Sequence, residues 1–187
     1  VASPHLARRF EHLETLKMDP MGVPKELLDS DLPDPFTGDP RATKEAVCAG
    51  TTQFDMDAIQ MMARLRPNWN FHIFGRLPDD MRGPDNVILH GEQKFVETAA
   101  WVKHADIGLA PYKDKPGVEY QTAHSNRMLM YRYLGLPMIG PKRLCDPTLP
   151  SLIGYSPNDE NSMLEALCAL ERLNISEPDS TLQDWSA

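Results

Sequence analysis

Short apolar runs alternate with amphipathic stretches along most of this chain. The apolar runs have the length of buried β-strands, and most of them end at or near Gly or Pro. They occupy residues 45–50, 70–75, 86–91, 106–112 and 136–141. Between them, residues 54–67, 94–105 and 125–135 carry apolar side chains at helical spacing, and a further strand and helix are indicated at 152–156 and 158–173.

This alternation predicts the fold class. Strands that alternate with helices form a parallel sheet joined by right-handed crossovers, with helices on both faces. The sequence therefore predicts an α/β, Rossmann-like, doubly wound domain. Ligands of such sheets bind beyond the carboxyl ends of the strands, near the helix N-termini. We expect the functional site among the loops that follow the predicted strands.

The two ends of the chain differ from this domain. Residues 18–44 contain five prolines and many acids without periodicity, which is typical of a linker and covering loop. We assign 45–175 to the Rossmann-like domain, 1–17 to the tail of a missing N-terminal domain, and 176–187 to a polar C-terminal tail.

Composition and charge argue against several classes of protein and of site. The chain has 187 residues, of which 41% are hydrophobic, enough for a core, and its formal charge of −8 argues against nucleic acid as a partner. Its cysteines (Cys48, Cys145 and Cys168) lack CxxC spacing, so neither a disulfide framework nor a zinc site is indicated and a reducing cytosol is favoured. The chain shows no signal-peptide pattern and no apolar run near the ~20 residues that cross a bilayer, so we expect any membrane contact to be peripheral.

One candidate anion site follows the first predicted strand. The backbone amides of Gly50 and the hydroxyls of Thr51 and Thr52 can hold an anion at the start of the next helix, although an ordinary βα turn has the same pattern. The sequence contains neither GxGxxG nor a P-loop. That absence argues against a dinucleotide-dependent dehydrogenase and against a kinase.

A second candidate lies at Ser125, Asn126 and Arg127, where another helix begins. Ser125 is a good N-cap, and Arg127 places a cation in a first turn whose helix dipole disfavours one. The cation is better explained if an anion shares the site, and a solvent-exposed arginine is the alternative. As a polar first-turn residue, Arg127 is expected to contribute little to folding.

Further polar residues follow the other strands. Glu92 can accept hydrogen bonds from ribose hydroxyls or a base, Tyr112 can stack or bind a phosphate, and Gln121 in the following loop can reach sugar hydroxyls. Each is compatible with an ordinary surface position, so their convergence on one edge of the sheet carries the prediction. His72 and His90 lie inside predicted strands and are expected in or near the core, and no histidine has metal-ligand spacing.

Three segments give the chain a resemblance to a known family. They are "AVCAGTTQFDMDAIQMMARLRPNWNFHIFG", "DNVILHGEQKFVETAAWVKHADIGLAPY" and "SNRMLMYRYLGLPMIG". In this order they resemble the C-terminal, nucleotide-sugar donor-binding half of a GT-B glycosyltransferase, over roughly residues 20–173. Among these enzymes the chain most resembles the bacterial exopolysaccharide glucuronosyltransferases of the xanthan type.

The resemblance implies a function. It implies an inverting, metal-independent transferase without a cofactor, which takes a UDP-sugar such as UDP-glucuronate and a polyprenyl-diphosphate-linked oligosaccharide acceptor at the cytoplasmic face of the membrane. By resemblance, Arg127 binds the pyrophosphate beside Ser125 and Asn126, and Glu92 and Tyr112 face the nucleotide. Met130 stands where many relatives have a ribose-binding Glu, so Glu92 is a candidate substitute.

The same resemblance assigns no catalytic residue to this chain, because the catalytic base of an inverting GT-B enzyme belongs to the N-terminal half. We therefore expect the chain to bind a donor without transferring it. Two alternatives stay open. One is a sugar-nucleotide 2-epimerase, which shares the architecture, and the other is a nucleotide-binding regulatory domain without chemistry.

Overall fold

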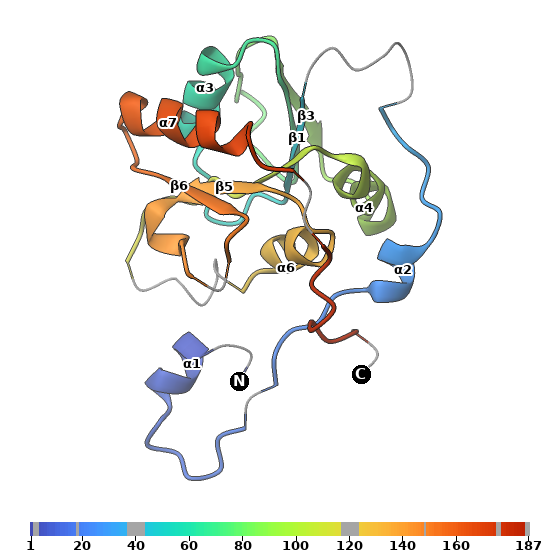
Figure 1. Ribbon diagram of the computed structural model, residues 1–187, viewed down its shortest axis with the longest axis vertical. Coiled ribbons are helices and arrows are strands. Elements are labelled where there is room, and N and C mark those ends of the chain that lie inside the picture. The colour runs from blue at the N-terminus through green and yellow to red at the C-terminus, as the bar shows by residue number, and fades with distance from the viewer. Residues whose placement is uncertain are drawn as a thin grey trace.

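Six parallel strands form one sheet in the order β3-β2-β1-β4-β5-β6, which confirms the predicted doubly wound α/β class (Figure 1). The computed structural model describes residues 1, 4–17, 19–36, 44–116, 124–147, 149–174 and 177–185. The strands are β1 (Glu45–Ala49), β2 (Asn70–Phe74), β3 (Val87–Gly91), β4 (Ile107–Leu109), β5 (Met138–Pro141) and β6 (Leu152–Tyr155). Each lies inside or within a residue of a predicted run.

Helices cover both faces of the sheet. The longer ones are α3 (Met56–Leu65), α4 (Phe95–His104), α6 (Asn126–Tyr133) and α7 (Glu160–Leu170). The short ones are α1 (Pro4–Arg9), α2 (Lys25–Asp29) and the 3-10 helix η1 (Lys142–Leu144). Side-chain caps explain three of the starts: Asp55, Ser125 and Asp159 each accept a hydrogen bond from a main-chain N–H three residues further on.

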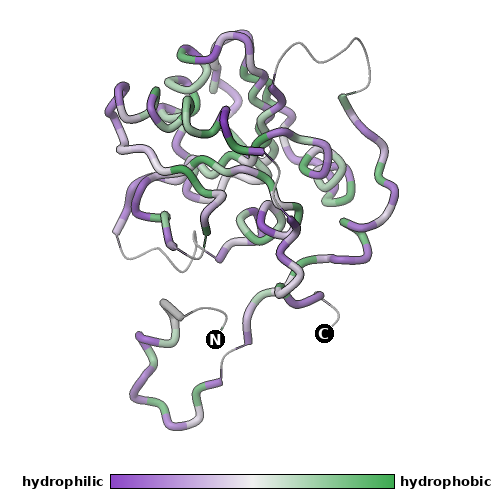
Figure 2. The backbone as a smooth tube through the Cα atoms, in the orientation of Figure 1, coloured by the Kyte–Doolittle hydropathy of each residue, from purple (hydrophilic) through white to green (hydrophobic). Residues whose placement is uncertain are grey.

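Strand alternation divides the core between the two faces. Ala46 and Cys48 of β1 face α3 and α7, whereas Val47 faces α4 and α6, because successive side chains of a strand point to opposite sides. Figure 2 shows the hydrophobic positions concentrated in the strands and in the inner sides of the helices. This arrangement leaves the loops at the carboxyl ends of the strands free to form a site.

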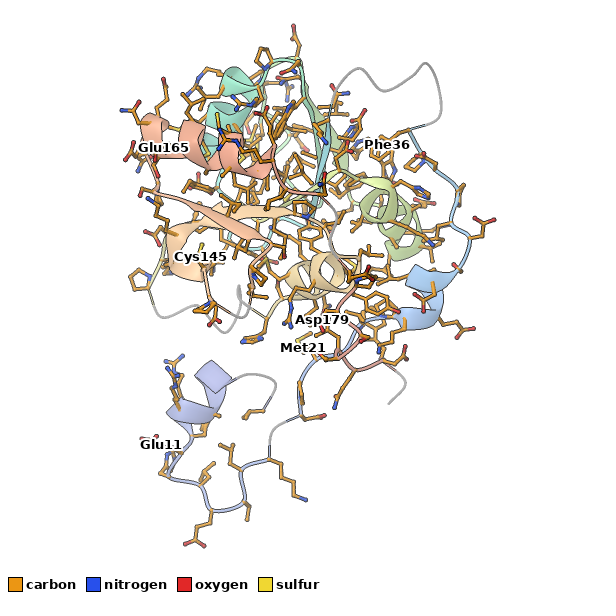
Figure 3. The ribbon with its side chains drawn as sticks, viewed as in Figure 1. Glu11, Met21, Phe36, Cys145, Glu165 and Asp179 are labelled. Carbon is orange, nitrogen blue, oxygen red and sulfur yellow. The ribbon has the colours of Figure 1, made fainter. Side chains whose placement is uncertain are left out.

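Two terminal segments pack on the α4 and α6 side. Val23 forms an isolated parallel bridge with Asp184, and Leu28 of α2 is buried in the same core as α4. Arg132 of α6 forms an ion pair with Asp179 at 2.6 Å, and Figure 3 shows Asp179 beside this helix. Figure 1 shows α1 apart from the sheet. The predicted boundaries of the linker and tail stay predictions.

The strand expected at 106–112 is shorter in the structure. β4 ends at Leu109, and Tyr112 instead forms an isolated antiparallel bridge with Phe54. Two features account for the difference. Pro111 has no main-chain N–H to continue a ladder, and the hydroxyl of Tyr131 enters the space where β1 and β4 would go on pairing.

Candidate functional site

A cavity of about 350 Å³ lies at the carboxyl ends of β1, β2 and β3, against the first turns of α4 and α6. It is beside the point where the strand order reverses, since β1 has β2 on one side and β4 on the other. Its lining residues are Ala49, Gly50, Phe74, Gly75, Glu92, Gln93, Phe95, Thr98, Asn126, Arg127 and Met130. Ligands of doubly wound sheets bind at this position.

Gly50 turns the chain out of β1 and over the cavity. Its φ of +108° is a conformation that a residue with a side chain rarely adopts, and its N–H still donates to the Phe74 carbonyl at 2.8 Å. The turn directs the carbonyls of Ala49 and Gly50 toward α6. The positions of these two carbonyls are therefore fixed by the main-chain geometry at Gly50.

Arg127, in the first turn of α6, binds the carbonyls of the Gly50 segment. Its Nε donates to the Ala49 carbonyl at 3.2 Å and its Nη2 donates to the Gly50 carbonyl. The guanidinium carbon lies 4.6 Å from the centroid of the Tyr112 ring. The side chain is 4% exposed, and Nη1 is buried without a hydrogen-bond partner among the described residues.

This geometry excludes the alternative for Arg127 and corrects the expectation that the residue contributes little to folding. The residue is not a solvent-exposed charge, and it cannot be neutral to folding, because it holds two main-chain carbonyls at the end of β1. The Nε and Nη2 edge of the guanidinium is taken up within the protein. Nη1 is the nitrogen of the group that has no partner among the described residues.

The charge of Arg127 is not compensated by its described neighbours. The neighbouring cysteine is Cys48, and burial raises the pKa of its thiol although Arg127 lowers it, so the thiol stays protonated at neutral pH. The ion pairs found within the described ranges involve other cations, among them Arg66 and Arg132, and none of them includes Arg127. A guanidinium stays protonated in proteins. The site thus presents an almost fully buried positive charge beside a cavity.

Other predicted residues lie near the cavity without lining it. Tyr112 is 1% exposed, and its hydroxyl lies 2.6 Å from the Ser125 hydroxyl oxygen, which itself accepts from Met128 N–H as the cap of α6. Both side chains thus support Arg127 and the start of its helix. Gln121 lies outside the described residues.

Of the three residues predicted to form an anion-binding turn after β1, one lines the cavity and two do not. Gly50 lines the cavity, whereas Thr51 donates its hydroxyl to the Arg76 carbonyl at 2.9 Å and Thr52 is exposed. The following helix begins with the carboxylate of Asp55, which accepts from Ala58 N–H. A carboxylate at that terminus disfavours a second anion there, so α6 is the better anion-binding helix.

Glu92 and Asn126 line the cavity, as expected, and so does Gly75 in the loop expected after the second strand. Other lining residues were missed, among them Phe74, which ends β2 and could have been identified by the rule that ligands bind at strand ends. Phe95 and Thr98 lie in the first turn of α4. Their apolar or neutral side chains carry no chemical signal in the sequence.

A buried polar chain lies behind Phe74. The His72 Nε2 atom lies 2.8 Å from a Glu45 carboxylate oxygen, and its Nδ1 lies 2.9 Å from His90 Nε2. The His90 ring stacks on Phe74 with centroids 4.3 Å apart. Burial lowers the pKa of both histidines, that of His90 to about 4, so both are neutral at pH 7. The carboxylate then accepts the His72 Nε2–H, which leaves His72 Nδ1 to accept from His90.

Two features of the described residues concern metals and membranes. In that part of the chain, no group of three or more His, Cys, Asp or Glu side chains is arranged to hold a metal ion. Within the same ranges, the helices are too short and too polar to cross a bilayer.

The fold and the place of the cavity define a doubly wound α/β protein whose site lies at the switch point of the sheet. A glucuronosyltransferase of Xanthomonas campestris pv. campestris, named UDP-glucuronate:glycolipid 2-beta-glucuronosyltransferase, is 33% identical over 134 residues. The match covers 70% of this chain and 33% of the relative, so the chain spans about a third of the relative's length. The chain belongs to the GT-B glycosyltransferases and corresponds to their C-terminal half.

A solved glycosyltransferase structure has the same fold. The spinosyn rhamnosyltransferase SpnG, solved with spinosyn aglycone, superposes with a TM-score of 0.52 at 12% identity, over 84% of this chain and 45% of that one. The glycosyltransferase GlyE of Streptococcus pneumoniae TIGR4 gives a TM-score of 0.49 at 18% identity, over 71% and 34%. No model of a protein family matches the sequence.

Proposed function

We propose that this chain binds the donor of an inverting, metal-independent glycosyltransferase, and that the donor is a UDP-sugar, UDP-glucuronate in particular. The observation that carries the proposal is Arg127, which lines the cavity and whose buried Nη1 has no partner among the described residues. An uncompensated buried cation is unfavourable by several kcal/mol unless an anion approaches it. The uronate donor is supported by the name of the Xanthomonas relative.

The lining residues suggest how such a donor lies. The diphosphate binds at the first turn of α6, where unpaired main-chain N–H groups and the helix dipole add to the charge of Arg127. The nucleoside then extends toward Phe74, Gly75 and Glu92. Met130 has no oxygen to accept from a ribose hydroxyl, so the carboxylate of Glu92 takes that role.

The full reaction needs more than this chain. In the proposed enzyme, the N-terminal half supplies the catalytic base and binds a polyprenyl-diphosphate-linked oligosaccharide at the cytoplasmic face of the membrane, in exopolysaccharide synthesis. Residues 1–187 alone are then expected to bind the donor and to transfer nothing. Sugar transfer catalysed by this chain alone would refute that division of roles.

Calorimetric titration tests the donor. UDP-glucuronate, UDP-glucose, UDP-N-acetylglucosamine, UDP, ADP and uridine are titrated into the chain separately. We expect all UDP compounds to bind, UDP-glucuronate most tightly, and uridine to bind at least tenfold more weakly than UDP. Equal affinity for uridine and UDP would contradict the phosphate site, and no binding of any nucleotide would contradict the proposal.

Two other functions are distinguished by product analysis of a protein that carries both halves of the proposed enzyme. A sugar-nucleotide 2-epimerase would return an isomerised UDP-sugar, whereas a transferase releases UDP. A regulatory domain would bind nucleotide and do neither. The relative's name favours the transferase.

A further inference from the structure

Tyr131 fills a gap in the sheet directly below the cavity. Within the described range 44–116, β1 and β4 pair at two positions, Ala46 with Ile107 and Val47 with Gly108. If this parallel ladder continued, the Ala49 N–H would donate to the Leu109 carbonyl. The Tyr131 hydroxyl lies there instead: it accepts from Ala49 N–H at 3.1 Å and donates to the Val47 carbonyl at 2.7 Å, with the Leu109 carbonyl at 3.3 Å.

The surrounding residues are shaped to admit this side chain. Gly108 lies under the ring, and a Cβ atom built there would be 2.6 Å from a ring carbon, a distance that no side chain tolerates. The ring is completely buried, and burial raises the pKa of Tyr131, so the hydroxyl keeps its proton. The tyrosine hydroxyl thus forms hydrogen bonds with the Ala49 N–H and the Leu109 carbonyl, which the separation of β1 and β4 would leave unpaired.

Tyr131 and Arg127 both bind main-chain groups of Ala49. They are four residues apart and so lie on one face of α6. Tyr131 binds the N–H of Ala49, and Arg127 binds the carbonyls of Ala49 and Gly50. Any shift of the Ala49–Gly50 segment therefore moves the acceptors that orient the guanidinium.

We propose that Tyr131 is a positioning residue of the anion site: its hydroxyl fixes Ala49 at the end of β1, and through Ala49 the carbonyls that set the direction in which Arg127 Nη1 meets a phosphate. The inference rests on the proposed function, in that the anion is the diphosphate of a nucleotide. It goes beyond that function because it assigns the alignment of Arg127 to a residue that does not line the cavity.

A double-mutant cycle separates positioning from simple structural support. Tyr131→Phe is expected to weaken UDP three- to tenfold and to change uridine affinity less than twofold. Arg127→Met removes the group through which Tyr131 acts, so adding Tyr131→Phe to that variant should weaken UDP by less than twofold. Additive losses would overturn the proposal, because independent sites add and coupled ones do not.

The matched control is Tyr155→Phe. Tyr155 is also completely buried, and its hydroxyl lacks a partner among the described residues, so its removal should leave UDP affinity unchanged. If the wild type binds UDP and Tyr131→Phe binds it equally well, the inference fails and the proposed function stands. If the wild type binds no nucleotide, the proposed function fails first.

Two further measurements test the same link, and the first is made on the wild type alone. The Ala49 amide proton, which donates to Tyr131, should exchange with solvent at least fivefold more slowly when UDP is saturating, since the ligand fixes the segment from the Arg127 side. In the ligand-free protein, Tyr131→Phe should also shift the NMR resonance of Arg127 Nε. Unchanged exchange on saturation with UDP would overturn the proposed link.

Discussion

Replacing Arg127 by alanine tests the central feature of the site. In the ligand-free protein the guanidinium donates to two carbonyls, those of Ala49 and Gly50, and leaves Nη1 for a phosphate. A hydrogen bond from a charged donor contributes about 1.5–3 kcal/mol. Loss of the Nη1 contact alone should therefore weaken UDP about ten- to a hundredfold, while uridine, which has no phosphate, changes less than threefold.

The same substitution affects stability in two opposing ways. It leaves two buried carbonyls without donors, which is unfavourable by about 1–3 kcal/mol for each group. It also removes a buried cation without a described counter-ion, which is favourable by up to several kcal/mol. We expect a net loss of about 1–3 kcal/mol in the free energy of unfolding, measured by urea denaturation without nucleotide.

Calorimetry with UDP and uridine, at a temperature where each variant is folded, completes the assay. Arg127→Lys keeps the charge but cannot hold both carbonyls and reach a phosphate, so it should recover only part of the affinity. Arg132→Ala is the control, because Arg132 lies on the same helix in an ion pair with Asp179. The reasoning is refuted if Arg127→Ala binds UDP like the wild type, or if UDP and uridine weaken equally.

Three further predictions concern stability and metals. Gly108→Ala should destabilise the fold by about 1–3 kcal/mol in urea denaturation, since its Cβ would meet the Tyr131 ring. The pKa of His90 is lowered from 6.5 to about 4, so the unfolded chain binds the proton first and stability falls as pH drops from about 6.5 toward 4. Because His90 is only half-buried, we expect a loss of about 1–2 kcal/mol in urea titrations at pH 7.5 and 4.5, and His90→Gln should flatten the dependence. Chelation by EDTA should leave UDP affinity within twofold, and a tenfold loss would indicate a metal-dependent site.

The strands were predictable from the sequence because a strand buried on both faces is a short apolar run. The runs at 45–50 and 70–75 match β1 and β2 within a residue. The early end of β4 was predictable only in part, from Pro111, which cannot continue a ladder. It also depends on Tyr131, which is 22 residues beyond Leu109 and looks like an ordinary core residue of a helix.

The site was predictable in position and only partly in detail. The rule that ligands bind at strand ends correctly located Gly50, Glu92 and Arg127 on one cavity. It could not predict that Arg127 is buried, because a first-turn arginine has the sequence pattern of a surface charge. Its burial follows from the turn at Gly50, whose carbonyls meet the guanidinium only in the folded sheet.

The way in which Arg127 is held has a consequence for nucleotide selection. A free guanidinium recognises a phosphate through two parallel hydrogen bonds, which select by geometry as well as charge. Here Nε and one N–H of Nη2 are already bound to the protein, so the Nη1 side of the guanidinium is left to meet a phosphate. Every nucleotide carries a phosphate, so this contact favours any nucleotide over a nucleoside and discriminates poorly between nucleotides. Discrimination between bases must then come from the opposite wall, where Phe74, Glu92 and Gln93 line the cavity.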